Sequence, residues 1–284
     1  MFSLTPYKRK RLFYSSAKGC TYLATLLGLV ALFAILIFVC KDGASGLSWN
    51  LFFGDYREAS PTIGPAILGT LQLLGWSLLF AFPIGVGAAV FLAEYTSTDS
   101  LPVRLIRLAT ETLSGIPSIV YGLFGNLCFV VSLHWGYSIL AGSLTLAIMI
   151  LPLIVRNVEE ALNSVPNSLR EGAYALGASK VRVIFTVALP SAAPGILTSL
   201  ILAMGRVVSE SAALLMTIGM VVGNVPETPL SPGTSLALDI YYFSSYGHQK
   251  EAAATSFVLL LFVLCIDLLA FALGKILERR KGKQ

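Results

Sequence analysis

The chain has 284 residues, of which 56% are hydrophobic and 12% are charged, and its mean hydropathy is +0.79. Soluble domains carry about 25% charged residues, so this composition argues against a soluble domain and indicates a polytopic membrane protein. The net charge of +5 does not indicate nucleic-acid binding, because the basic residues cluster at the ends of apolar runs without a nucleic-acid motif. The four cysteines lie in or beside apolar segments without metal-ligand spacing, so we expect neither a metal site nor a disulfide.

The apolar runs predict an all-α membrane protein with six transmembrane helices. Each run is long enough to cross about 30 Å of hydrocarbon as a helix. The first follows a basic N-terminus but is too long for a signal-peptide core and has no Ala-x-Ala site, so we expect it to remain as a span. The six lie near Cys20–Cys40, Ala66–Ala93, Leu113–Leu133, Tyr137–Val155, Gly195–Met220 and Thr255–Leu277.

The distribution of Lys and Arg predicts the orientation. Sixteen of the twenty lie in the N-terminal arm, the second and fourth connections and the C-terminal tail, which places these segments and both termini in the cytoplasm. Three more, Lys41, Arg57 and Lys250, lie in the outward connections, and Arg206 lies within a span. The predicted organisation is a basic arm (1–19), a first span (20–40), an external loop (41–63), a core (64–279) with a cytoplasmic loop (156–194), and a basic tail (280–284).

The cytoplasmic loop before the fifth span has the pattern of two short helices. Residues 167–187 mix apolar and charged side chains at helical spacing, and Gly177 suggests a turn between the helices. Pro190 and Pro194 mark the start of the next span. Such a projection would offer apolar side chains and a carboxylate to a soluble partner, and the alternative is a solvated amphipathic surface helix.

This loop resembles the EAA motif of bacterial ABC-importer permeases, which reads Glu-Ala-Ala, three residues, Gly, nine residues, Ile, one residue, Leu-Pro. Gly172 departs from the motif in place of the first Ala, and Val187 in place of the Ile. The resemblance implies that the loop is the coupling helix that docks on an ATPase subunit. The residues in register are Glu171, Gly172, Ala173, Gly177, Leu189 and Pro190.

Arg206 and Glu210 lie four residues apart inside the fifth apolar run, "LAMGRVVSESAALL". We expect Arg206 near the middle of the span, where a charge costs roughly 2.5–3.5 kcal/mol and should face the protein interior or a water-filled cavity. Glu210, one turn on, can pair with it. An arginine suits an oxyanion because its planar fork is always charged, and small residues including Ser211 leave room for a solute. The alternative is an ion pair that only locks two helices.

A second segment, "ETLSGIPSIVYGLFGN" (111–126), interleaves glycine and proline at the entry to the third span. This density predicts a broken or kinked helix, whose exposed N–H groups could hold an anion with a donor from Ser118. Close helix packing through small residues is the alternative. The last outward connection is long, with prolines and an aromatic cluster, and could either receive an external protein or act as a surface lid.

Together these segments resemble the PstA-type permeases of high-affinity phosphate importers, over roughly residues 64–277. This chain has Ser-Glu-Ser around Glu210 where the family usually has Gly-Glu-Thr, so the hydroxyl at Ser211 is kept. The likeness implies the type I, MetI-like importer fold, a bacterial inner-membrane location, a PstC-type partner permease, a dimer of ATP-binding subunits and an external phosphate-binding protein. The family elements fall on Gly205, Arg206 and Glu210, and on Gly115, Pro117, Ser118, Ile119 and Val120.

The chain has no Gly-x-x-x-x-Gly-Lys-[Ser/Thr] sequence, so we expect no cofactor on it, with ATP and Mg²⁺ bound by a separate subunit. The alternative functions are a permease for another oxyanion (sulfate, molybdate or phosphonate), an ion-coupled secondary carrier, and an intramembrane serine hydrolase. The EAA-like loop argues against a secondary carrier. The histidines, His134 and His248, lie in outward loops away from the serines of the fifth span, which argues against a hydrolase.

Overall fold

Long apolar helices build the protein, and a computed structural model describes residues 6–54, 61–96, 100–281 of the chain. The segments predicted as 1–19, 41–63 and 280–284 lie partly outside the described residues, and so does Arg57. The elements run in the order α1 (Pro6–Ser45), α2 (Trp49–Phe53), α3 (Gly64–Val90), η1 (Phe91–Tyr95), α4 (Leu101–Ser114), α5 (Ser118–Gly125), η2 (Asn126–Ser132), α6 (Ile139–Asn163), α7 (Asn167–Ala175), α8 (Lys180–Val183), η3 (Ile184–Ala188), α9 (Leu189–Val208), α10 (Ala212–Leu215), α11 (Leu236–Ser245) and α12 (Gln249–Lys281), where η marks π-helical segments.

The six predicted spans correspond to five long apolar helices and one bent pair. The single helices are long and apolar enough to cross a membrane at Ala17–Ser45, Gly64–Tyr95, Ile139–Asn163, Lys180–Val208 and Gln249–Ala272. The third predicted span is a pair, Val103–Ser114 and Ser118–Ser132, bent by 101°. The predicted break at the glycine- and proline-rich segment is therefore confirmed, and the total is six if the pair is one span.

Helix α6 forms the centre of the bundle because its apolar residues occupy most of its circumference. Leu146, Ile150 and Ile154 are fully buried in a core shared with α3 and α9. Helix α3 lies directly against it: a Cβ added at Gly85 would come 2.7 Å from Ile154 Cγ2, so only glycine permits this contact. The core thus joins the three helices that connect the outward end of the molecule to the α7–α8 end.

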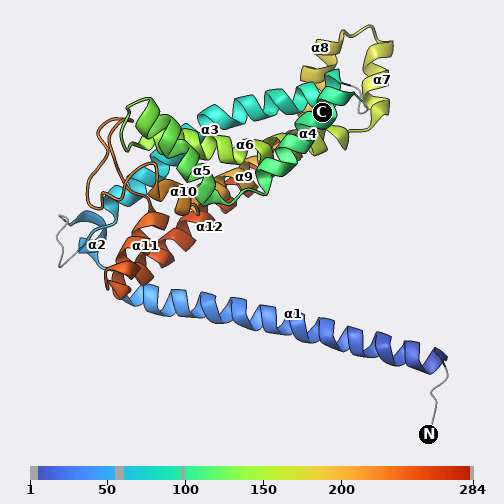
Figure 1. The fold of residues 1–284 in the computed structure, drawn as a ribbon. Coiled ribbons are helices and arrows are strands. Elements are labelled where there is room, and N and C mark those ends of the chain that lie inside the picture. The colour runs from blue at the N-terminus through green and yellow to red at the C-terminus, as the bar shows by residue number, and fades with distance from the viewer. Residues whose placement is uncertain (1–5, 55–60, 97–99, 282–284) are drawn as a thin grey trace.

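Helix α1 lies apart from this core and contacts α12 near its own C-terminal end (Figure 1). Its crossing depends on Gly43, where an added Cβ would come 2.5 Å from Phe257 Cβ. The most apolar window of α1 has none of its residues buried within this chain, so its side chains are left for lipid or another subunit.

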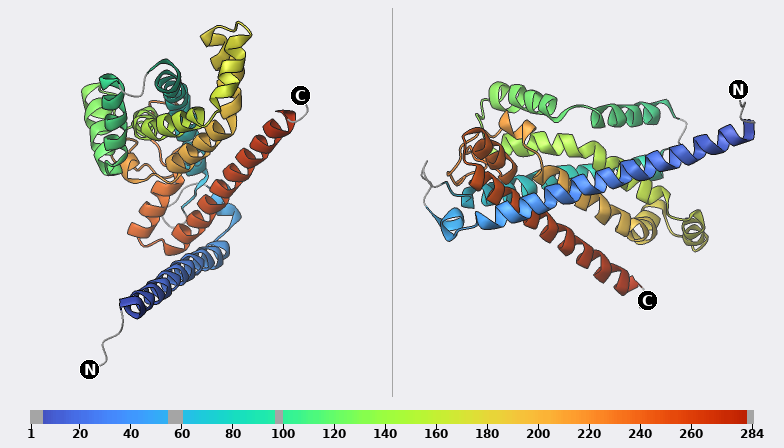
Figure 2. Two further views of the ribbon diagram at one scale, coloured as in Figure 1. Left: turned by 90° about the vertical axis from the view of Figure 1, so that its right-hand side faces the viewer. Right: turned by 90° about the horizontal axis from the view of Figure 1, so that it is seen from below.

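Both ends of the chain lie toward the same end of the molecule. Figures 1 and 2 show the N-terminal end of α1, the C-terminal end of α12 and the α7–α8 hairpin there, while α11 lies at the opposite end. This arrangement agrees with a topology in which the termini and the loop before the fifth span share one side of the membrane.

Candidate functional site

Arg206 lies in the last turn of α9, because this helix ends at Val208. The prediction that Arg206 lies near the middle of a span reaching Met220 was therefore wrong. The Ser209 hydroxyl donates to the backbone oxygens of Gly205 (2.9 Å) and Arg206 (3.4 Å), and such local bonds compete with continued helix. A cation in the last turn of a helix is favoured by the helix dipole.

Glu210 follows the end of α9 and supports the short helix α10. Its Oε1 accepts a hydrogen bond from the backbone N–H of Ala213 at 3.2 Å. Its Oε2 lies 3.7 Å from Nη2 of Arg206. The predicted pairing of these two residues is confirmed, although the two stand on either side of a helix break and not on one continuous helix.

The two partners differ in exposure. The Glu210 side chain is only 5% exposed, whereas the Arg206 side chain is 51% exposed in this chain. A guanidinium has five N–H donors, and this long contact to Glu210 occupies little of that capacity. Within the described part of the chain, the buried carboxylate is the ion-pair partner of Arg206. A guanidinium with unused donors has the chemistry to bind an oxyanion in a bidentate way.

Ser211 and Ser118 lie at the starts of two short helices, α10 and α5. Ser211 precedes α10 and is partly buried, and Ser118 is the first residue of α5, immediately after the bend. Among the described residues, no hydrogen bond joins either hydroxyl to Arg206 or Glu210. Their place in a substrate path therefore remains a prediction.

Helices α5 and α10 pack closely and run in the same direction. A Cβ at Gly122 would come 2.8 Å from the Cα of Ala213, and the Asn126 side-chain amide donates to the Met216 carbonyl at 2.7 Å. Both contacts follow the same order along the two helices, so Ser118 and Glu210 lie toward the same end of this packed pair. Two segments that are distant in sequence, one after the bend and one after the end of α9, thus pack on each other.

The predicted turn between two short helices is confirmed at Gly177, which has a φ of +80°. The N–H of Gly177 bonds to Tyr174 O at 2.9 Å and that of Ala178 to Ala173 O at 3.2 Å, the two bonds of a Schellman motif. Of the motif residues, Glu171, Gly172 and Gly177 are exposed, while Ala173, Leu189 and Pro190 are partly buried. Leu189 and Pro190 begin α9, six residues before the predicted start of the fifth span at Gly195.

The α7–α8 hairpin exposes large apolar side chains at the end of the molecule. Leu176 is 90% exposed, and Leu169, Tyr174 and Phe185 are exposed as well. A concentration of apolar groups on a projecting hairpin is typical of a protein-docking surface. The structure thus contains a half-exposed arginine in the last turn of α9 and, on the hairpin that precedes α9, an exposed apolar surface. Figure 1 shows the α7–α8 hairpin projecting at one end of the molecule.

The chain matches the family model described as "Binding-protein-dependent transport system inner membrane component" over residues 81–283. The chain belongs to this family. The match runs from the last part of α3 to α12 and includes the hairpin and the Arg206–Glu210 pair. The chain is therefore a transport subunit with multiple membrane-spanning helices, in the inner membrane.

Relatives extend over almost the whole chain. A probable ABC transporter permease protein, YqgI of Bacillus subtilis, is 37% identical over 270 residues, which is 89% of this chain and 90% of the relative. The phosphate transport system permease protein PstA of Xylella fastidiosa is 33% identical over 278 residues, 94% of each chain.

Solved structures confirm the all-α ABC-importer permease fold. A chain of a bacterial alginate ABC transporter, crystallised with an alginate-bound periplasmic protein, superposes with a TM-score of 0.65, 19% identity and 93% coverage of both chains. A chain of the MetNI methionine ABC transporter superposes with a TM-score of 0.63 and 20% identity, covering 76% of this chain and 97% of that one. At these identities the superpositions establish the MetI-like fold alone.

Proposed function

We propose that this chain is a permease subunit of an ATP-driven importer of inorganic phosphate. The observation that carries the proposal is its similarity, over 94% of both chains, to a permease named for phosphate transport. The half-exposed Arg206 supports an anionic cargo, because its guanidinium keeps donors available on the side away from Glu210. Binding at this single cation is weak, as it must be for an ion that has to leave again.

The importer requires partner chains for the parts that this chain does not supply. A PstC-type permease forms the other half of the path, a pair of ATP-binding subunits binds ATP and Mg²⁺, and an external binding protein delivers phosphate. The exposed Leu176 and Tyr174 of the hairpin support docking on an ATP-binding subunit, and the unburied apolar side chains of α1 support lipid or permease contacts. Both termini face the cytoplasm, on the side of the hairpin.

Transport proceeds by alternating access. ATP binding between the partner subunits moves the hairpin that contains Glu171, Gly172, Ala173 and Gly177, and α9, starting at Leu189 and Pro190, carries this movement toward Arg206. Phosphate enters from the binding protein, meets Arg206 beside Ser118 and Ser211, and leaves when ATP hydrolysis reopens the path to the cytoplasm. Glu210 keeps the arginine in position and offsets its charge while no anion is bound.

Uptake of labelled phosphate at limiting concentration tests this proposal. Cells that lack the chain are complemented with the native protein or with an empty vector, and sulfate and molybdate are added as competitors. We expect uptake only with the native protein and no inhibition by either competitor. Strong inhibition by sulfate or molybdate would identify another oxyanion as the cargo, and equal uptake without the chain would contradict a role in phosphate import.

A further inference from the structure

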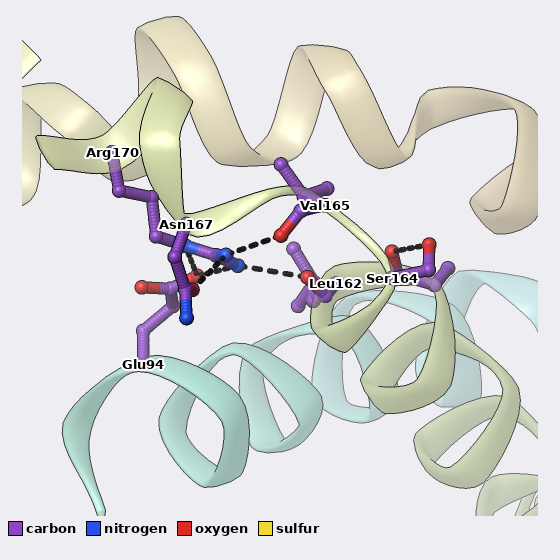
Figure 3. Close-up of polar contacts among 7 residues, drawn as sticks. Glu94, Leu162, Ser164, Val165, Asn167 and Arg170 are labelled. Atoms are coloured by element: carbon purple, nitrogen blue, oxygen red, sulfur yellow. Dashed lines mark hydrogen bonds and ion pairs between the residues drawn. The ribbon is translucent and has the colours of Figure 1, made fainter. Parts of the chain in front are cut away.

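A second arginine, Arg170, forms the most extensively bonded side-chain cluster among the described residues. It lies in α7, directly before Glu171 of the hairpin motif, and its guanidinium contacts four other residues (Figure 3). Nε and Nη2 donate to Glu94 Oε1 at 3.2 and 2.9 Å. Nη2 also donates to Leu162 O at 2.7 Å, and Nη1 donates to Val165 O at 2.7 Å and to Asn167 Oδ1 at 3.2 Å.

These contacts, which we call the Glu94–Arg170 clasp, join three parts of the chain. Glu94 belongs to η1, the π-helical continuation of α3, and Leu162 belongs to the last turn of α6. The last carbonyl groups of a helix have no hydrogen-bond donor within the helix. At the end of α6, Nη2 of Arg170 donates a hydrogen bond to one of them, the carbonyl of Leu162. One side chain of α7 therefore binds the ends of both α3 and α6.

The clasp is shielded from solvent. The Arg170 side chain is 13% exposed and that of Glu94 is 5% exposed. Removing one partner of a buried ion pair leaves the other charge unpaired, which is strongly unfavourable. The arrangement thus holds α7 in one position relative to α3 and α6.

The second helix of the hairpin contacts the same segment. The Lys180 ammonium at the start of α8 lies 4.8 Å from the centroid of the Tyr95 ring, a cation–π distance. Adjacent residues of η1, Glu94 and Tyr95, therefore contact the two arms of the hairpin. Further along the hairpin, Tyr174 and Leu176 are exposed.

Helices α3 and α6 in turn pack on each other and on α9, which ends beside Arg206. We propose that Glu94 and Arg170 are positioning residues that transmit movement of the hairpin to α3 and α6, in parallel with the direct connection through α9. This proposal rests on the proposed function, because it assigns the clasp to the coupling of ATP hydrolysis to transport. The proposal also assigns a function to η1, which contains Glu94. Single π-helical turns within α-helices are frequent at functional sites.

The first test measures phosphate uptake and ATP hydrolysis together in the complete transporter reconstituted in vesicles. In Glu94→Gln, we expect the ratio of phosphate moved to ATP hydrolysed to fall about tenfold, within the usual range of coupling between sites. Docking is monitored by cross-linking a cysteine at Leu176 to the ATP-binding subunit, and we expect it to persist. An unchanged ratio in an assembled variant would overturn the proposal.

Two further variants separate transmission from simple folding. Arg170→Lys keeps the positive charge but loses the planar fork, so the side chain cannot bond Glu94 and the carbonyls of Leu162 and Val165 together. We expect a transporter that assembles but moves less phosphate per ATP hydrolysed. Glu159→Gln is the matched control, since Arg107 and Glu159 form a 2.6 Å ion pair that joins α4 to α6 instead of joining the hairpin to the core. Two results would contradict the proposed role of the clasp, even if Glu94→Gln fails to assemble. One is an unchanged ratio of phosphate moved to ATP hydrolysed in Arg170→Lys, and the other is a fall in this ratio in Glu159→Gln as large as that in Arg170→Lys.

A second measurement is independent of the cargo. Spin labels at Leu176, beyond α7, and at Leu79, an exposed position on α3, report whether the hairpin and α3 move together. With the native clasp, we expect the distance between the two labels to be the same in the ATP-free and the ATP-bound transporter. In Arg170→Lys, we expect this distance to change when ATP binds. A separation that changes equally in both proteins would overturn the clasp, whereas a native transporter that moves no phosphate would count only against the proposed function.

Discussion

Two Arg–Glu pairs of this protein, Arg206–Glu210 and Arg170–Glu94, have the same chemistry but differ in geometry and exposure. Arg206 is half exposed and meets Glu210 through one contact of 3.7 Å. Arg170 is mostly shielded from solvent and makes five hydrogen bonds, two of them to Glu94. An arginine whose donors are all occupied can hold structure but has no capacity left for a ligand. The difference supports the two proposals made above, that Arg206 binds the cargo and that Arg170 holds α7 in position.

The largest effect is expected from Arg206→Ala. If Arg206 binds the cargo, its removal lowers phosphate uptake about a hundredfold, the equivalent of losing a charge-assisted interaction of about 3 kcal/mol. Uptake of labelled phosphate in complemented cells measures this effect, and immunodetection confirms that the chain reaches the membrane. Arg104→Ala, at an exposed arginine of α4, is the control and should transport normally. Normal uptake in Arg206→Ala would make the pair with Glu210 purely structural.

A smaller effect is expected from Glu171→Lys, next to the buried Arg170 but itself exposed. Reversing this charge on the docking surface should reduce the stimulation of ATP hydrolysis by phosphate-loaded binding protein about tenfold, because like charges at an interface cost several kcal/mol. Glu111→Lys, an exposed carboxylate on α4, serves as the control. If Glu171→Lys leaves the stimulation of ATP hydrolysis unchanged, Glu171 has no role in docking on the ATP-binding subunit. Arg170 would then be the one charged residue of α7 with a proposed function.

Gly122→Ala should disturb the support of the Arg206–Glu210 pair without changing any charge. The added Cβ would come 2.8 Å from Ala213 Cα and 2.9 Å from its oxygen, so α5 and α10 must separate. We expect a loss of about 1–3 kcal/mol in the free energy of unfolding, measured by thermal denaturation in detergent. At Gly75, where nothing lies within 4 Å, the same substitution should not destabilise the protein. Equal stability of the two variants would refute the close contact.

The smallest effect concerns Asp239, a buried carboxylate that, unlike Glu94, has no cation beside it among the described residues. Burial raises its pKa to about 7 from 3.8, against a lowering effect of the hydrogen bond from Thr234, and its Oδ2 has no hydrogen-bond partner. The folded protein therefore holds a proton that the unfolded chain releases, so stability is lost as pH rises from about 4 to about 7.

Asp239→Asn removes this dependence. Its melting temperature should exceed that of the native protein by a few degrees at pH 8, at about 2–4 °C per kcal/mol, and the difference should shrink toward pH 5. The control Glu227→Gln alters an exposed carboxylate of the same outward connection and should keep the native pH profile. A constant difference between Asp239→Asn and native protein across this range would contradict a buried neutral carboxyl.

The sequence predicted those features that depend on local patterns. Apolar runs located the spans, the glycines and prolines of 111–126 located the break before α5, and Gly177 located the turn of the hairpin. The end of α9 was missed, because apolar residues resume after Ser211 and the whole run to Met220 reads as one span. The break itself depends on the Ser209 hydroxyl and on Glu210, which bonds the backbone of α10. Hydropathy does not register such bonds.

The clasp was missed for a different reason. Glu94 and Arg170 are 76 residues apart in the sequence. Neither lies in the middle of an apolar run, where a charged residue would indicate a functional site. The one available signal was their position: Glu94 closes the second span and Arg170 directly precedes the motif residue Glu171. Pairing between such distant residues follows from the packing of α3 on α6, which the sequence pattern does not specify.

The most direct test of the difference between the two pairs is the dependence of transport on phosphate concentration in Arg206→Lys and Glu94→Gln, measured in the same vesicles. If Arg206 binds the cargo and Glu94 transmits movement, Arg206→Lys raises the KM with the maximal rate largely retained, and Glu94→Gln lowers the maximal rate with the KM unchanged. If both variants change the same parameter in the same way, the division of labour between the two arginines is wrong.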